Sequence, residues 1–203
     1  MNQTDNLENL KEINEIFVNN GNKCFIMAGT LLGYTRENKF ISHDHDVDVG
    51  TMFEGFNKNI IKQMIQQEWT LKNIFGYPYD SMLFQWQKRN STLDMYFYYN
   101  NEDKFYHSCY GPCYVSETNT TEYIQRYDYY YKKFDLKKVE FLKNEFYAPE
   151  DDTTFLEEMY GSNWRITNKN WDYTKDPKNI VDRKTTFNKI DQKKEIKKWF
   201  KEK

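Results

Sequence analysis

Residues 28–50 read AGTLLGYTRENKFISHDHDVDVG, and the end of this stretch decides how the whole chain is interpreted. In residues 44–48 an aspartate occupies every second position, which is the period of a strand. Asp44, Asp46 and Asp48 are therefore predicted to share one face, with the intervening valines turned to the core. Three crowded carboxylates repel one another unless a cation neutralises them, and hard oxygen ligands suit Mg²⁺ (or Mn²⁺). The alternative is an exposed acidic strand that discourages aggregation.

A glycine pair lies just upstream of the acidic strand. Gly29 and Gly33 follow a short apolar run at residues 24–28, predicted to be a buried strand, and lead into a short helix that ends near Arg36. Backbone N–H groups at a helix start, which glycine leaves open to close approach, bind phosphate well. The alternative is an ordinary tight turn.

A second acidic position occurs inside an aromatic strand. Asp94 sits in residues 93–97, LDMYF, where a charge is costly unless it has a partner. If this strand lies beside the first, Asp94 can join the same site, and carboxylates that share divalent ions are common in phosphoryl and nucleotidyl transfer. The alternative places Asp94 on the wet face of the sheet.

The remaining elements mix helices and strands without regular alternation. This mixture favours an α/β (α+β) fold with a mixed central sheet flanked by helices, in a single domain over residues 1–203. The predicted helices are 5–19, 57–67, 151–160 (capped by Asp152 or Thr153) and a basic helix at about 187–201; the predicted strands are 69–75, 82–88 and 93–99, with a hairpin over 138–147 and no assignment for 100–135.

The amino-acid composition limits which classes of protein this chain can belong to. Only 38% of the residues are hydrophobic and the mean hydropathy is −0.98, but 17 Tyr, 15 Phe and 5 Trp can build a core from rings. The net charge of −2 creates no field that would attract nucleic acid. The run at residues 127–131, YDYYY, could stack bases or sugars, although a packed aromatic layer is favoured.

Targeting signals are not evident. No apolar run approaches the roughly 18 residues that a transmembrane helix needs. The polar, acidic start of the chain does not resemble a signal peptide, and three cysteines with no secretory signal indicate reduced thiols. We therefore expect a cytoplasmic protein.

The motifs resemble those of the LicD family, which includes bacterial phosphocholine transferases and fukutin-related proteins. The likeness rests on residues 28–50, on the second acidic strand at 93–96 and on FYAPEDDTTFLEEMYGSNW at 146–164, and it spans a catalytic core of about 7–177. Ser42 and His43 depart from the Pro-Trp step of the family pattern, which puts the substrate pocket in question but removes no carboxylate.

The resemblance implies a nucleotidyltransferase-like fold and an enzyme. Members cleave a CDP-linked donor, transfer phosphocholine, ribitol phosphate or glycerol phosphate to a hydroxyl of a glycan or lipid-linked glycan, and release CMP. Carried over to this chain, the resemblance implies metal ligands at Asp44, Asp46, Asp48 and Asp94; catalytic roles for Asp46, Asp48, Asp94 and Arg36; and phosphate contacts from Gly29, Thr30, Gly33 and Arg36.

Two other functions share the same sequence features. A plain nucleotidyltransferase that moves NMP from an NTP would use the same carboxylates, and a catalytically silent glycan-binding protein could retain the fold. Some relatives carry a zinc-binding insertion, and His107, Cys109 and Cys113 form H-x-C-x-x-x-C, but a structural zinc needs four ligands and no fourth is evident.

Overall fold

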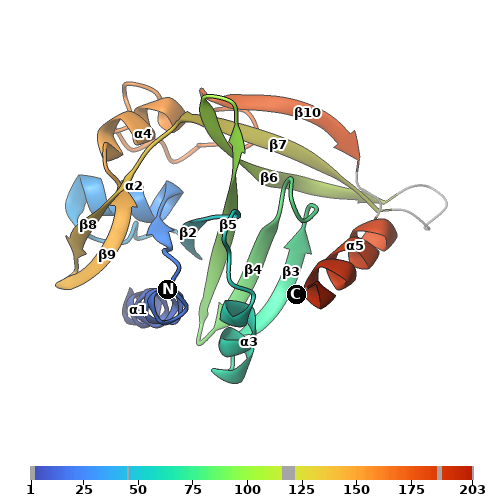
Figure 1. Ribbon diagram of the computed structural model, residues 1–203. Helices are drawn as coiled ribbons and strands as arrows, with labels where there is room; N and C mark the ends of the chain where they lie inside the picture. The colour runs from blue at the N-terminus through green and yellow to red at the C-terminus, as the bar shows by residue number, and fades with distance from the viewer. Residues whose placement is uncertain (1–2, 45, 116–121, 187–188, 203) are drawn as a thin grey trace.

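The computed structural model describes residues 3–44, 46–115, 122–186 and 189–202, with the backbone alone described for 112–115, 122–124, 182–186 and 189–190. Within these residues, five helices flank one sheet of ten strands (Figure 1). The sheet contains both parallel and antiparallel pairs. The predicted mixed α/β fold is confirmed.

The strands follow the order β10-β7-β6-β5-β2-β1-β9-β8, and β4 branches from β5 and carries β3 on its other edge. Only β2–β5 and β1–β9 are parallel among the described pairs. The strands are β1 Phe25–Ile26, β2 Asp46–Met52, β3 Thr70–Phe75, β4 Leu83–Lys88, β5 Ser91–Asn101, β6 Lys104–Val115, β7 Glu122–Lys132, β8 Leu136–Phe141, β9 Asn144–Pro149 and β10 Ile180–Thr186.

The helices pack in two groups on the central strands. α1 lies against β2, β5 and α3, whereas α2 lies against β2 and α4, and α4 also meets β7 and β9. They span Gln3–Asn19 (α1), Ala28–Glu37 (α2), Asn59–Gln66 (α3), Asp152–Tyr160 (α4) and Lys189–Lys201 (α5). β2 and β5 therefore lie at the centre of the molecule, enclosed by helices.

The core is built largely from rings, as the composition indicates. Phe84, Trp86, Phe97 and Tyr98 are fully or almost fully buried. Rings pack edge to face, as between Phe84 and Phe97, whose centroids lie 5.2 Å apart. Such rings bury large apolar areas, which compensates for the low content of aliphatic side chains.

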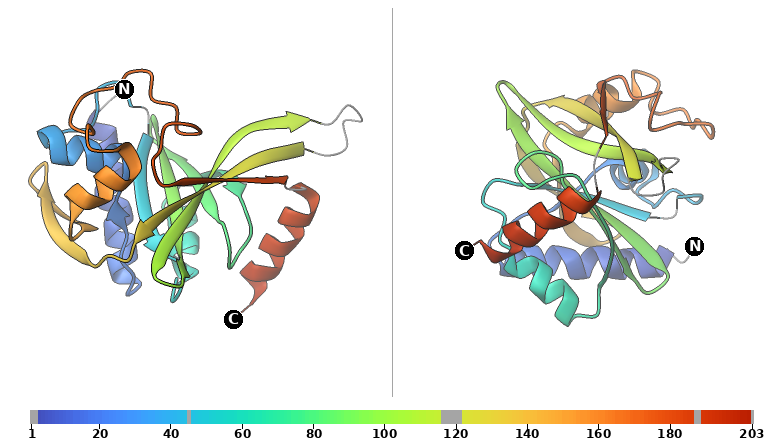
Figure 2. Two further views of the ribbon diagram at one scale, coloured as in Figure 1. Left: turned by 90° about the horizontal axis from the view of Figure 1, so that it is seen from above. Right: turned by 90° about the vertical axis from the view of Figure 1, so that its right-hand side faces the viewer.

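Within the unassigned segment 100–135, β6 and β7 pair antiparallel as a long arm, and β10, which was not predicted, pairs with the outer edge of β7. Figure 2 shows this arm extending away from α1, α2 and α4, with α5 following β10. Tyr129 and Tyr131 are buried, and His107 stacks on Tyr129 with centroids 4.9 Å apart. The favoured interpretation of the tyrosine run as a packed layer is confirmed for these two rings.

Three of the differences between the expected and the observed elements concern α2, β2 and the cap of α4. α2 begins at Ala28, so the glycine pair lies inside the helix and not in a turn before it. β2 begins at Asp46, two residues later than predicted. The cap of α4 is Asp151, whose side chain accepts a hydrogen bond of 3.0 Å from the backbone N–H of Thr154, so Asp152 and Thr153 were the wrong choices.

Two further observations concern cysteines and membrane spans. Cys24 and Cys109 are free thiols, and the side chain of Cys113 lies outside the described residues. Across the described part of the chain, every helix is too short or too polar to span a bilayer.

Candidate active site

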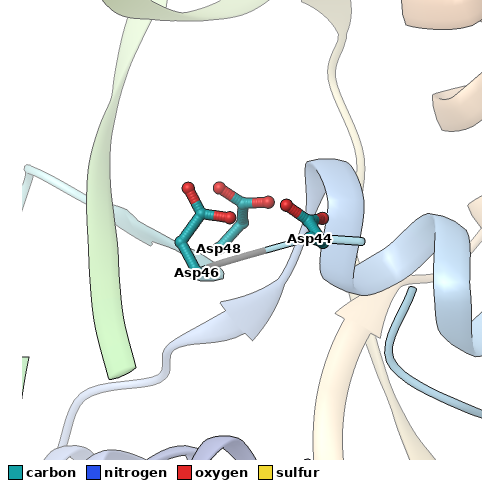
Figure 3. Close-up of side chains that lie close together, drawn as sticks. All are labelled: Asp44, Asp46 and Asp48. Carbon is teal, nitrogen blue, oxygen red and sulfur yellow. The ribbon is translucent and has the colours of Figure 1, made fainter. Parts of the chain in front are cut away.

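Three aspartates converge at the start of β2. Asp46 and Asp48 are on the strand and Asp44 is in the segment before it, and one oxygen from each lies within 4.8 Å of the others (Figure 3). Strand alternation places Asp46 and Asp48 on one face, while Val47 and Val49 are fully buried on the other. The sequence thus predicted this cluster, except that Asp44 precedes the strand. His45, between them, lies outside the described residues.

Asp94 lies beside the cluster on the neighbouring strand. β2 and β5 are parallel, and their register pairs Asp48 with Asp94. Both side chains are buried, at 7% and 6% exposure. Asp94 is outside the group whose oxygens lie within 4.8 Å of one another. Its strand does lie beside the acidic strand, which is the condition that the sequence analysis set for Asp94 to join the site.

The electrostatics of the site show an excess of negative charge. Burial, followed by the charges of Asp46, Asp44 and Asp94, raises the pKa of Asp48 well above its usual value. Burial and the charge of Asp46 raise the pKa of Asp94 to about 7, against an opposing hydrogen bond from Gln85. A divalent cation would relieve this repulsion.

One oxygen of Asp94 has an unmet hydrogen-bonding capacity. Oδ1 of Asp94 is buried and has no hydrogen-bond partner among the described residues. A buried polar atom without a partner is costly and is uncommon in folded proteins. The carboxylate cluster and this oxygen together fit a site for a hard cation such as Mg²⁺ or Mn²⁺.

The first turn of α2 holds the acidic strand in place. The backbone N–H of Gly29 donates to Oδ2 of Asp48 at 2.9 Å, and the hydroxyl of Thr30 accepts from the backbone N–H of Asp48 at 2.9 Å. A Cβ at position 29 would overlap Oδ2 of Asp44 and lie 3.1 Å from Oδ2 of Asp48. Gly29 thus leaves room for carboxylates, and its approach to phosphate stays a prediction.

Gly33 and Arg36 occupy the next turns of α2. A Cβ on Gly33 would overlap the carbonyl oxygen of Lys39, so this glycine lets the following loop pass close to the helix. The guanidinium of Arg36 donates to the carbonyl oxygens of Trp164 and Ile166, the latter at 3.1 Å. Arg36 therefore joins α2 to the segment after α4, and its contact with phosphate remains untested.

A cavity of about 940 Å³ opens beside the cluster. Gly29 and Asp44 are among the residues that line it, and its walls come from α2, the loop 39–44 and the segment 160–178. Its lining includes four basic side chains and four rings: Arg36, Lys39, Lys169 and Lys178, with Phe40, Tyr160, Trp164 and Trp171. This volume suits a ligand of nucleotide size.

Sequence reasoning identified only part of this cavity. Trp171 lines the cavity, and the centroid of its ring lies 4.7 Å from that of Tyr160. Lys169 and Lys178 were missed because they lie in a coil segment with no periodic pattern. Gln85, which contacts Asp94, was also missed, although it is a polar residue in an otherwise apolar run, LFQW.

The H-x-C-x-x-x-C motif forms no zinc site among the described side chains. The acidic cluster is the only group of three or more potential metal ligands brought together in the described residues. Burial lowers the pKa of His107 to about 3, and its ring packs among tyrosines. Cys113 falls outside the described side chains.

Comparisons with known proteins agree with this geometry. Residues 21–151 match the model of the LicD/FKTN/FKRP nucleotidyltransferase domain. The ribitol-5-phosphate transferases FKTN of Mus musculus and Homo sapiens are each 27% identical over 157 residues, or 77% of this chain and 32% of theirs. An uncharacterized protein of Rickettsia typhi is 28% identical over 153 residues, or 74% of this chain and 44% of its own.

The chain spans about a third of the length of the FKTN relatives. The residues that match the domain model include the acidic strand and the strand of Asp94. The matched domain covers well over half of the chain, from before β1 to the cap of α4. The chain therefore belongs to the LicD/FKTN/FKRP nucleotidyltransferase-domain family.

Proposed function

We propose that this protein is a divalent-cation-dependent transferase that moves a phospho-alcohol from a CDP-linked donor to a glycan hydroxyl and releases CMP. The observation that carries the proposal is the convergence of Asp44, Asp46 and Asp48, with Asp94 on the neighbouring strand, beside a cavity of about 940 Å³ that Asp44 lines. The FKTN relatives, named as ribitol-5-phosphate transferases, favour ribitol phosphate as the transferred group.

In this proposal, residues of the chain bind the cation and the CDP-linked donor. Mg²⁺ or Mn²⁺ held by Asp44, Asp46 and Asp48 with Asp94 alongside would neutralise the donor diphosphate and increase the electrophilicity of its phosphorus. Lys39, Lys169 and Lys178 line the cavity and offer positive charge to the donor. The ring of Trp171, which is partly exposed and lines the cavity, provides a flat apolar surface suited to the cytosine base.

Asp94 is suited to accept the proton of the attacking hydroxyl. It is paired with Asp48 in the strand register, and a cation bound at the cluster would keep its carboxylate ionised and able to take up a proton. As the proton moves to Asp94, the acceptor oxygen bonds to the phosphorus that carries the alcohol. The bond from that phosphorus to the bridging oxygen breaks, and CMP leaves with the electron pair.

The proposal is tested by thermal melts and product analysis. The protein is heated with Mg²⁺ or Mn²⁺ in the presence of CDP-ribitol, CDP-choline, CDP-glycerol, CMP, CTP or ATP. A donor at a hundredfold over its Kd should stabilise the fold by about 2.7 kcal/mol. The stabilisation should require the metal and be lost in Asp46→Asn, and CMP should appear when an acceptor glycan is added.

Asp103→Asn is the matched control. Asp103 lies in the exposed turn between β5 and β6, so the same change of charge there should preserve both the melt shift and CMP release. Pyrophosphate release from CTP or ATP would instead identify a nucleotidyltransferase of the ordinary kind. Full activity in Asp46→Asn would refute the assignment of the carboxylate cluster.

A further inference from the structure

Three neighbouring strands carry a line of polar side chains that ends at Asp94. Gln85 on β4 lies opposite Asp94 on β5 in the strand register, and Asn73 on β3 lies opposite Gln85. Nε2 of Gln85 donates to Oδ2 of Asp94 at 3.2 Å, and Nδ2 of Asn73 donates to Oε1 of Gln85 at 2.9 Å. The line therefore reaches from the exposed edge strand to the buried carboxylate.

A β-bulge sets this alignment. The pairing of β3 with β4 runs from Leu71 opposite Trp86 directly to Asn73 opposite Gln85, with a register shift between Leu71 and Asn73. A regular ladder would instead place Lys72 opposite Gln85. Bulges near functional sites commonly re-aim a side chain, and this one brings an amide donor to Oε1 of Gln85.

The consequence concerns which oxygen of Asp94 is free. The hydrogen bond from Asn73 occupies Oε1 of Gln85, so the NH₂ group of Gln85 is turned to Asp94. Oδ2 of Asp94 then has a donor, whereas Oδ1 is buried with no partner among the described residues. The donor is neutral, so it orients Asp94 without cancelling the negative charge of the site.

We propose that Gln85, oriented by Asn73, is a positioning residue that holds the Asp94 carboxylate with Oδ1 presented to a divalent cation at the Asp44–Asp46–Asp48 cluster. This inference rests on the proposed function, because it assumes that the cluster binds a metal. It adds two residues of β3 and β4 to the site. Residues that orient metal ligands commonly change metal affinity by about 10- to 100-fold when they are replaced.

The test measures Mn²⁺ binding by electron paramagnetic resonance, with the full chain and no substrate. Gln85→Met preserves length and removes the amide, so the Kd for Mn²⁺ should rise by about 10- to 100-fold. Gln87→Met is the matched control, because Gln87 is two residues further along β4 and is similarly half-buried. The control should leave the Kd unchanged, and Asn73→Ala should raise it by less than Gln85→Met.

A double-variant cycle shows whether Gln85 acts through Asp94. If it does, Gln85→Met should have no further effect on the Kd in an Asp94→Ala background. Thermal melts without metal verify that each variant is folded. If Gln85→Met does not fold, Asn73→Ala replaces it in the test, because Asn73 is exposed and its replacement should preserve the fold.

The outcomes separate this inference from the function on which it rests. If the wild type binds Mn²⁺, Asp94→Ala weakens binding and Gln85→Met does not, the role of Gln85 is refuted and the proposed function stands. If Gln85→Met and Asp94→Ala weaken Mn²⁺ binding independently, so that their effects add in the double variant, the role of Gln85 is refuted as well. No Mn²⁺ binding by the wild type would overturn the metal dependence itself, and the role of Gln85 with it.

Discussion

At the scale of single residues, the site is a concentration of acid groups that the fold buries. Asp48 and Asp94 face each other across β2 and β5, and burial raises the pKa of both. Gly29 donates its N–H to Asp48, and its missing side chain leaves room for Asp44. The glycine at position 29 is therefore explained by the volume of the carboxylates, at a cost in helix propensity of about 1 kcal/mol.

The raised pKa of Asp94 predicts a pH dependence of stability in the metal-free protein. The folded-state pKa is about 7, above the usual value of about 3.9, so the folded state binds more protons between these limits. The free energy of unfolding should therefore fall as pH rises from about 4 through 7. Urea unfolding in EDTA should show this fall in the wild type and a smaller one in Asp94→Asn.

The difference in the free energy of unfolding between wild type and Asp94→Asn, taken at each pH, isolates the contribution of the Asp94 carboxyl group from that of the other titrating groups. Adding Mg²⁺ should reverse much of the loss at pH 7 and above, because a bound cation favours the ionised form. Parallel stability curves for wild type and Asp94→Asn over this pH range would contradict the prediction.

At the scale of elements, α5 is a docked helix and not a free basic tail. Trp199 is buried, with its ring stacked on that of Phe56 at 6.4 Å between centroids. Nε2 of Gln192 donates to the carbonyl oxygens of Ile74 and Gly76, at 3.1 and 3.0 Å, where β3 ends. The described lysine side chains of α5 are exposed, as expected for an amphipathic surface helix; they are Lys193, Lys194, Lys197, Lys198 and Lys201.

Replacing the anchoring ring of α5 should destabilise the protein. Trp199→Ala removes a buried ring that also contacts Phe53 and Phe84, and such changes cost about 3–5 kcal/mol. Phe200→Ala is the control, since that ring is 39% exposed, and its effect should be much smaller. Urea unfolding monitored by circular dichroism would measure both. Equal effects from the two variants would show that α5 is not anchored through Trp199.

At the scale of the whole molecule, a buried charged group connects distant parts of the chain. Arg126 on β7 donates to Asp128 on the same strand, with Nη2 to Oδ2 at 3.0 Å, and to Asp80 in the turn between β3 and β4, with Nη2 to Oδ1 at 3.1 Å. Asp128 is fully buried and also accepts from the hydroxyl of Ser108 at 2.6 Å. This network joins the extended arm to the branch of the sheet that carries Gln85.

Removing the arginine should therefore destabilise the molecule strongly. Arg126→Met leaves the buried charge of Asp128 uncompensated, which typically costs about 3–5 kcal/mol. Arg89→Met is the comparison, because the pair of Arg89 and Glu12 is more exposed and should contribute about 1 kcal/mol or less. Chemical denaturation would rank the variants. Asp128→Leu added to Arg126→Met should recover part of the loss, and further destabilisation would argue against charge burial as the cause.

Much of the fold was predictable because it depends on local periodicity. The amphipathic pattern fixed α1, and alternation in aromatic and β-branched runs predicted β3, β4 and β5 to within a few residues. The arm of β6 and β7 was not predictable. Its many tyrosines and charged residues give the segment a polar sequence with no clear strand pattern. They can be buried in the fold because rings stack across the strands and Arg126 neutralises the buried Asp128. β10 was missed for a related reason, since it is an edge strand with a polar sequence.

The sequence by itself determined that Asp46 and Asp48 share one face of a strand, because strand geometry allows no other arrangement. Tertiary structure alone decided that Asp94 stands beside Asp48, since that contact depends on the parallel register of β2 and β5, which are separated by β3 and β4 in the chain. It also decided the bulge that aligns Asn73 with Gln85, and the cavity between α2 and the segment 160–178. Long-range pairing and packing set these features, and neither leaves a periodic trace in the sequence.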